Sequence, residues 1–185
     1  MSKLSRGLRN NNPGNIDYNR RRAQGAGMIG EFLDPLIVQA YAKGEWVLMA
    51  DFRYVAADGT IYTAPKYFIT DLASTPWLIK PFLRGIEDRA CGVIHDFVYC
   101  QNTLPREACD GLFYEMLLTT GADLRRAQLM FSGLRIGGGS RYRQCAGGMK
   151  VEDLAFELMT PQEAAEWRLR LLVQASSATR TPCRR

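Results

Sequence analysis

The stretch GEWVLMADFRYVAADGTIYTAPKYFIT, residues 44–70, decides the fold class of this chain. Apolar and polar residues alternate along it, and many of its side chains are aromatic or β-branched, which is the pattern of strands with one buried face. Asp58 and Gly59 interrupt the alternation with a turn signal. Pro65, which has no backbone N–H to donate, marks a strand edge. The stretch therefore predicts a small antiparallel β-hairpin or meander.

The residues that follow change to the helical period. In IEDRACGVIHDFVYCQ, residues 86–101, the apolar side chains gather on one side, as a half-buried helix requires. Further helices are expected over residues 105–118 and 122–136. In TPQEAAEWRLRLLVQA, residues 160–175, the residue types at the first four positions are those of a helix start. The predicted fold class is α+β, with the hairpin or meander followed by a three-helix cluster and a C-terminal helix.

Composition divides the 185 residues into four segments. Residues 1–43 are expected to form an irregular basic N-terminal arm, because Asn, Arg and Gly dominate their first part. Residues 44–140 form the α+β core domain. Residues 141–159 form a glycine-rich connection, and residues 160–185 hold the C-terminal helix and a basic tail.

The formal net charge of +5 is concentrated at the two ends of the chain. Such ends can bind nucleic acid or anionic cell-wall polymers by counterion release, or can remain solvated tails. Every apolar run is shorter than the roughly 20 residues that span a bilayer, so no transmembrane segment is expected. No apolar region follows the basic N-terminus, so no secretory signal is visible. The protein is expected either to stay in the cytoplasm or to leave by a route such as cell lysis.

The five cysteines are odd in number and form no C-x-x-C pair. This pattern disfavours a zinc ribbon and a complete disulfide framework. Cys91, Cys100 and Cys109 lie in an apolar, helix-like region and are expected to be buried, reduced thiols.

Ionisable residues gather around His95, the one histidine of the chain. His95 and Tyr99 are four positions apart and share a face of the expected helix, whereas Asp96 points about 100° away. Arg106 and Asp110, also four apart, lie in a polar stripe of the next helix. Two antiparallel helices would bring the stripes together.

Together with Asp71, which follows a strand, this cluster contains the groups of a metal site with mixed oxygen and nitrogen ligands, or of an acid/base pair tuned by burial. The ion would be zinc, magnesium or manganese. The zincin pattern H-E-x-x-H is absent, and one histidine cannot supply a three-histidine zinc site. The expected roles are metal binding by Asp71, His95 and Asp110, catalysis by His95, Asp96 and Asp71, and substrate binding by Tyr99, Arg106 and Ser74.

Two other interpretations of the cluster stay open. Ser74 and His95 with Asp110 or Asp71 can be written as a Ser-His-Asp triad, but no G-x-S-x-G elbow supports it. Ser74 is equally explained as a helix cap or as a turn residue, and Cys109 is a weak nucleophile candidate. A buried network of His, Asp, Arg and Tyr can also hold two helices to a strand without performing any reaction.

Four ordered stretches carry a family resemblance: APKYFITDLASTP (64–76), GVIHDFVYC (92–100), PREACDGLFYEMLLTTGA (105–122) and GLRIGGG (133–139). Over residues 44–140 they resemble the phage and prophage group called domain of unknown function 1353. The resemblance implies a phage origin more firmly than an activity. Tyr67 stands where the family pattern has a glycine. The family's recurrent polar residues fall on Thr70, Asp71, Ser74, His95, Asp96, Tyr99, Arg106 and Asp110.

The N-terminal RGLRNNNPGNI, residues 6–16, is similar to the opening of phage virion proteins with murein-degrading associations. The leading hypothesis is a virion- or lysis-associated protein that hydrolyses peptidoglycan with a divalent metal. The alternative is a non-enzymatic tail, neck or baseplate assembly protein whose polar cluster is structural. The expected partners are other phage structural proteins and peptidoglycan, with nucleic acid less favoured. The expected location is the host cytoplasm during synthesis, then the virion or the medium after lysis.

Overall fold

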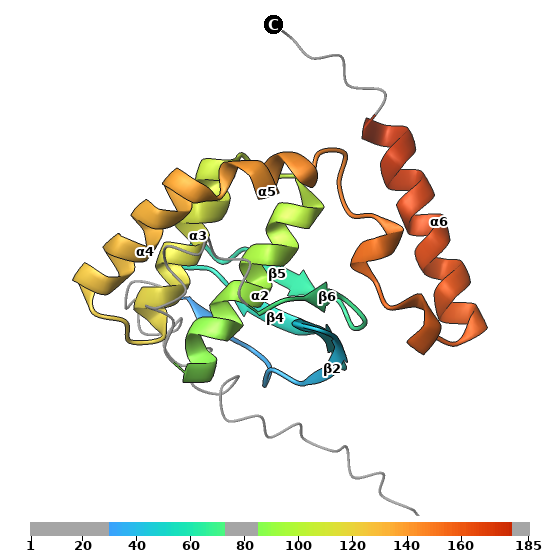
Figure 1. Ribbon diagram of the computed structural model, residues 1–185, viewed down its shortest axis with the longest axis horizontal. Coiled ribbons are helices and arrows are strands. Elements are labelled where there is room, and N and C mark those ends of the chain that lie inside the picture. The colour runs from blue at the N-terminus through green and yellow to red at the C-terminus, as the bar shows by residue number, and fades with distance from the viewer. Residues whose placement is uncertain (1–29, 73–84, 179–185) are drawn as a thin grey trace, which may run out of the picture.

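The computed structural model describes residues 30–72 and 85–178 (Figure 1). Residues 1–29, 73–84 and 179–185 lie outside the described residues, and with them Ser74 and the N-terminal stretch that resembles virion proteins. Antiparallel strands come first and helices follow. The predicted α+β class is confirmed.

The strands of the described part form two antiparallel sheets. One has the order β1-β4-β5, with β1 at Glu31–Phe32, β4 at Phe52–Val55 and β5 at Ile61–Ala64. The other has the order β2-β3-β6, with β2 at Val38–Ala42, β3 at Glu45–Leu48 and β6 at Ile69–Thr70. The predicted turn joins β4 to β5, where Gly59 has a φ of +88° and the Thr60 backbone N–H donates to Asp58 Oδ1 at 2.8 Å. Glycine is favoured at such a φ because it has no Cβ.

Strands β1 and β2 lie in the segment for which the sequence predicts an irregular arm. Phe32 of β1 pairs with Tyr54 of β4, and Gln39 of β2 pairs with Val47 of β3. β1 has only two residues and β2 is largely exposed, so neither shows a clear alternation of its own. Pairing with the core strands, rather than local pattern, makes these residues extended.

The main helices are α2 (Gly85–Gln101), α3 (Arg106–Thr119), α4 (Leu124–Gly137) and α6 (Pro161–Ala178), each within two residues of its expected start. The predicted helix start of α6 takes the form of a capping box, because the Thr160 backbone N–H donates to Glu163 Oε2 at 2.8 Å and the Glu163 backbone N–H donates to Thr160 Oγ1 at 3.3 Å. The expected glycine-rich connection contains most of α5 (Gly139–Gln144) and two short 3-10 helices, Val151–Asp153 and Phe156–Leu158.

Helix α2 is the centre of the fold. It contacts β4, β5 and β6 as well as α3 and α5, and every residue from 90 to 100 is buried. The Phe97 ring meets Phe68, which follows β5, edge to face with centroids 5.8 Å apart. The half-buried helix expected from the sequence is therefore a wholly buried one along most of its length.

Helix α6 lies at the opposite end of the molecule from α4 (Figure 1). Its inner side packs against the core through Trp167 and Leu171. Its outer side leaves Leu169, Leu172 and Val173 exposed. Within residues 30–72 and 85–178, no helix combines the length and apolar character needed to cross a membrane.

Candidate functional site

The polar cluster forms around Asp110 of α3, whose side chain is 0% exposed. Tyr99 of α2 donates its hydroxyl to Asp110 Oδ1 at 2.5 Å, and His95 Nε2 lies 3.2 Å from the same oxygen. His95 is 2% exposed, and its ring packs against those of Tyr99 and Phe113. The predicted meeting of the two polar stripes is present, because the four-residue spacing places His95 and Tyr99 one turn apart on the face toward α3.

Two arginines contact the other oxygen of the same carboxylate. Arg135 of α4 donates from Nη1 to Asp110 Oδ2 at 3.0 Å, and Arg106 Nε lies 3.5 Å from Oδ2. Arg106 Nη2 also donates to the backbone carbonyls of Leu134 and Arg135 near the end of α4. Cations near a helix C-terminus satisfy its unpaired carbonyls and favour the helix dipole. Through Asp110 the network joins α2, α3 and α4.

The surroundings of Asp110 keep its carboxylate ionised. Burial acts to raise the pKa of Asp110, but hydrogen bonds from His95 and Tyr99 and the positive Arg135 outweigh burial and hold the pKa below its ordinary value. Burial, followed by the hydrogen bond to the anionic Asp110, raises the pKa of the Tyr99 hydroxyl. Tyr99 is therefore a proton donor in the network and a poor candidate for a base at neutral pH.

Asp96 belongs to a separate interaction on another side of α2. Its Oδ2 accepts a hydrogen bond of 2.7 Å from Thr70 Oγ1, which in turn accepts the Leu72 backbone N–H at 3.1 Å. This buried link fastens α2 to the end of β6. The angular separation of Asp96 from His95 predicted by the helix period is confirmed.

The structure does not bring the three expected metal ligands together. Asp71 is exposed, whereas His95 and Asp110 are buried. A carboxylate has about four acceptor positions, and Asp110 is already contacted by four donor groups, which belong to His95, Tyr99, Arg106 and Arg135. Among the described residues, no group of three His, Cys, Asp or Glu side chains is arranged to hold a metal ion. The donor set therefore does not fit a divalent metal.

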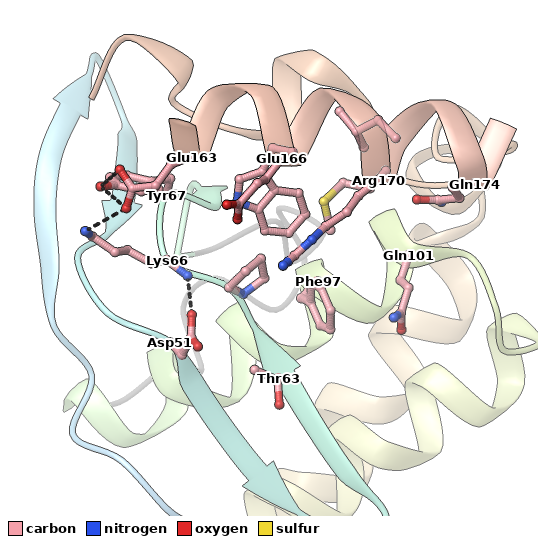
Figure 2. A pocket seen from close by; sticks show the side chains of 14 residues that line it. Asp51, Thr63, Lys66, Tyr67, Phe97, Gln101, Glu163, Glu166, Arg170 and Gln174 are labelled. Atoms are coloured by element: carbon pink, nitrogen blue, oxygen red, sulfur yellow. Dashed lines mark hydrogen bonds and ion pairs between the residues drawn. The ribbon is translucent and has the colours of Figure 1, made fainter. Parts of the chain in front are cut away.

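A cavity of about 490 Å³ lies between α6 and the body of the molecule (Figure 2). Its walls come from β5 and the segment after it, from α2 and from α6. Among the described residues that were predicted to bind metal or substrate, or to act in catalysis, none lines it. A second cavity, of about 640 Å³, is lined by Tyr114 and residues of α4 and its start. Neither of these two cavities of the described structure reaches His95, Asp96 or Asp110.

The core of the chain matches the model of a known protein family. Residues 46–134 match the model of the family described as protein of unknown function (DUF1353). The core belongs to this family. Over 88 residues the chain is also 31% identical to the uncharacterized protein y4iH of Sinorhizobium fredii, an alignment that covers 46% of this chain and 37% of that protein. The chain thus matches well under two thirds of that relative's length. No solved structure matches the chain.

The DUF1353 segment contains Asp110 and its partners on α2 and α3, but it ends just before Arg135. Sequence reasoning missed Arg135 as a member of the network. The signal that could have found it is its position in the GLRIGGG motif, the fourth stretch that resembles the family. The segment also ends well before α6, so one wall of the 490 Å³ cavity lies outside the DUF1353 match.

Proposed function

We propose that this chain is a non-enzymatic assembly protein of a phage or prophage particle, in its tail, neck or baseplate, and that the network around Asp110 is structural. The complete burial of the Asp110 side chain carries the proposal. A general acid or base must come within hydrogen-bond reach of the proton that it transfers, directly or through one water. Asp110 instead faces protein donors on both of its oxygens.

The connections of the network also support an architectural role. One carboxylate contacts donors on three helices, and Arg106 reaches the last carbonyls of α4 from α3. Arg106 Nε is buried without a hydrogen-bond partner, but the hydrogen bonds to both oxygens of Asp110 are made, and a buried polar network of this kind specifies one arrangement of the elements that it joins. Such a network suits a small protein that must present fixed surfaces to its neighbours.

The phage context rests on resemblance. The stretch at residues 6–16 is similar to the opening of virion proteins, and the DUF1353 motifs resemble a phage and prophage group. We therefore propose other phage structural proteins as partners, with synthesis in the host cytoplasm followed by incorporation into the virion. Hydrolysis of peptidoglycan is less favoured, because the two described cavities contain none of the proposed catalytic residues.

Quantitative mass spectrometry of particles induced from the encoding strain tests the proposal. We expect the chain at a copy number that is a fixed small multiple of a known tail or neck protein. A parallel murein turbidity assay compares the wild type with His95→Gln. Absence from particles, or murein clearance that is lost in His95→Gln while its thermal stability is kept, would contradict the assembly role.

A further inference from the structure

We propose that the 490 Å³ cavity between α6 and the body binds a neutral carbohydrate chain (Figure 2). Its volume lies within the range of roughly 300–1,000 Å³ that is typical of small-ligand sites. The cavity shares no side chain with the network around Asp110. The inference therefore goes beyond the assembly role and does not depend on it.

Side-chain contacts hold the α6 wall in place at one end of the cavity. Tyr67 donates its hydroxyl to Glu163 in the first turn of α6, 3.2 Å from either carboxylate oxygen, and Lys66 Nζ lies 3.7 Å from Glu163 Oε1. The Lys66 backbone N–H donates to Asp51 Oδ1 at 2.8 Å. On the inner side of α6, Trp167 packs against the core. The cavity is thus built between anchored elements.

The backbone at Tyr67 has an uncommon conformation. Its φ is +73°, a region that non-glycine residues seldom adopt. Here a strained tyrosine supplies the ring that lines the cavity and the hydroxyl that reaches Glu163. Leu72 and Asn102, which do not line the cavity, also have positive φ, so this backbone conformation fixes the position of the Tyr67 ring without by itself marking a ligand site.

The charge of the lining selects against anions. Three carboxylates, of Asp51, Glu163 and Glu166, face two cations, of Lys66 and Arg170, which leaves one negative charge on a chain whose net charge is +5. Lys66 is already paired with Glu163. A phosphate- or sulfate-bearing ligand would therefore meet repulsion here, whereas a neutral ligand would not.

The remaining groups match the two kinds of surface that a sugar ring has. Trp167 and Phe97 contribute apolar ring surface to the lining, although Phe97 is only 5% exposed and the Arg170 guanidinium carbon lies over the Trp167 ring, 4.9 Å from its centre. Gln101 and Gln174 bring amides to the other end of the cavity from Glu163, as Figure 2 shows. Apolar ring surface can pack against the C–H groups of a sugar, and amides and carboxylates pair with hydroxyls that both donate and accept.

Calorimetric titration with neutral hexasaccharides tests the inference, with chitohexaose, cellohexaose and maltohexaose as probes. We expect at least one to bind with one-to-one stoichiometry. The affinity should fall by roughly tenfold or more in Trp167→Ala, because the stacking surface is lost. Leu172→Ala is the matched control, since Leu172 lies on the same helix but is 68% exposed and lines no part of the cavity. It should bind like the wild type.

Because Trp167 also packs on the core, Gln101→Ala on α2 provides an independent variant whose fold can be checked by circular dichroism. It should weaken binding of the same hexasaccharide several-fold. The inference would be overturned if none of the three sugars bound at concentrations on the order of millimolar. It would also be overturned if Trp167→Ala and Gln101→Ala both bound the sugar as tightly as the wild type. Saturable binding of a neutral hexapeptide, with no sugar bound, would reassign the cavity to a peptide. If the chain were incorporated into particles but bound no sugar, the sugar-binding inference would be wrong and the proposed assembly role would remain.

Discussion

Replacement of Asp110 should destabilise the whole helix cluster, because this buried carboxylate on α3 accepts hydrogen bonds from α2 and from α4. In Asp110→Asn the volume is nearly unchanged, but the negative charge is lost and an N–H₂ group faces existing donors. Hydrogen bonds to a charged group each contribute about 1.5–3 kcal/mol. The bonds from His95 and Tyr99 are fully buried, so this range applies to them.

The arginine contacts contribute less to this sum. The Arg135 side chain is 36% exposed, so water screens its attraction to Asp110, and such pairs are typically worth about 0–1 kcal/mol. Removing one member of a buried ionic network costs about 3–5 kcal/mol. We therefore expect Asp110→Asn to lower the free energy of unfolding by about 2–4 kcal/mol, and Asp110→Ala by about 3–5 kcal/mol because it also leaves a cavity.

Urea unfolding at neutral pH measures both losses. The m value should stay unchanged, and with m of about 2 kcal/mol per M, inside the usual range of about 1–3, the midpoint should fall by about 1–2.5 M across the two variants. Glu152→Gln is the control, since that side chain is 73% exposed and should change stability by less than about 0.5 kcal/mol. An Asp110→Asn protein as stable as the wild type, or more stable, would refute the structural role and point to a group retained for chemistry.

Three further predictions concern pH, a second buried bond and a thiol pair. The pKa of Asp110 in the folded protein lies below its ordinary 3.8, so the carboxylate's contribution to stability is complete above about pH 5 and is lost as the pH falls through the folded pKa. Below about pH 5, the melting temperature of Asp110→Asn should therefore depend less on pH than that of the wild type. Thr70→Val, which removes the 2.7 Å bond to Asp96, should cost about 1–2 kcal/mol in urea unfolding. The buried sulfur atoms of Cys100 and Cys145 lie 3.7 Å apart, so oxidation by diamide should form a disulfide between them. Peptide mass spectrometry should then find the two cysteine peptides linked, with a mass lower by two hydrogens than their sum.

The elements that the sequence predicts are those with local signals. The turn at Asp58 and Gly59 and the capping box of Thr160 and Glu163 are encoded within four residues, and both are present in the structure. β1 has no comparable signal, because a two-residue strand is extended only through its pairing with β4. The short helices between α5 and α6 likewise depend on contacts such as the bridge between Phe68 and Leu154.

The pairing of His95 with Asp110 could be predicted because both lie in stripes with a four-residue period on successive helices. The burial of the pair could not. The ionisable side chains of α2 have the spacing of a solvent-exposed polar face on an amphipathic helix, so the sequence predicts a half-buried helix. In the structure, strands and helices cover α2 on several sides. Arg135 was missed because its approach to Asp110 depends on how α4 packs against α3, which no local pattern fixes.

Helix α2 divides its sides between the two roles proposed for this protein. His95 and Tyr99 face α3, Asp96 faces β6, and Phe97 and Gln101 form the side of the cavity opposite α6. A change in the network can therefore shift the cavity floor through the same helix, and loss of sugar binding in a network variant would not identify a ligand contact. The α6 side gives the cleaner probe, because it lies beyond the DUF1353 match and is attached through Tyr67.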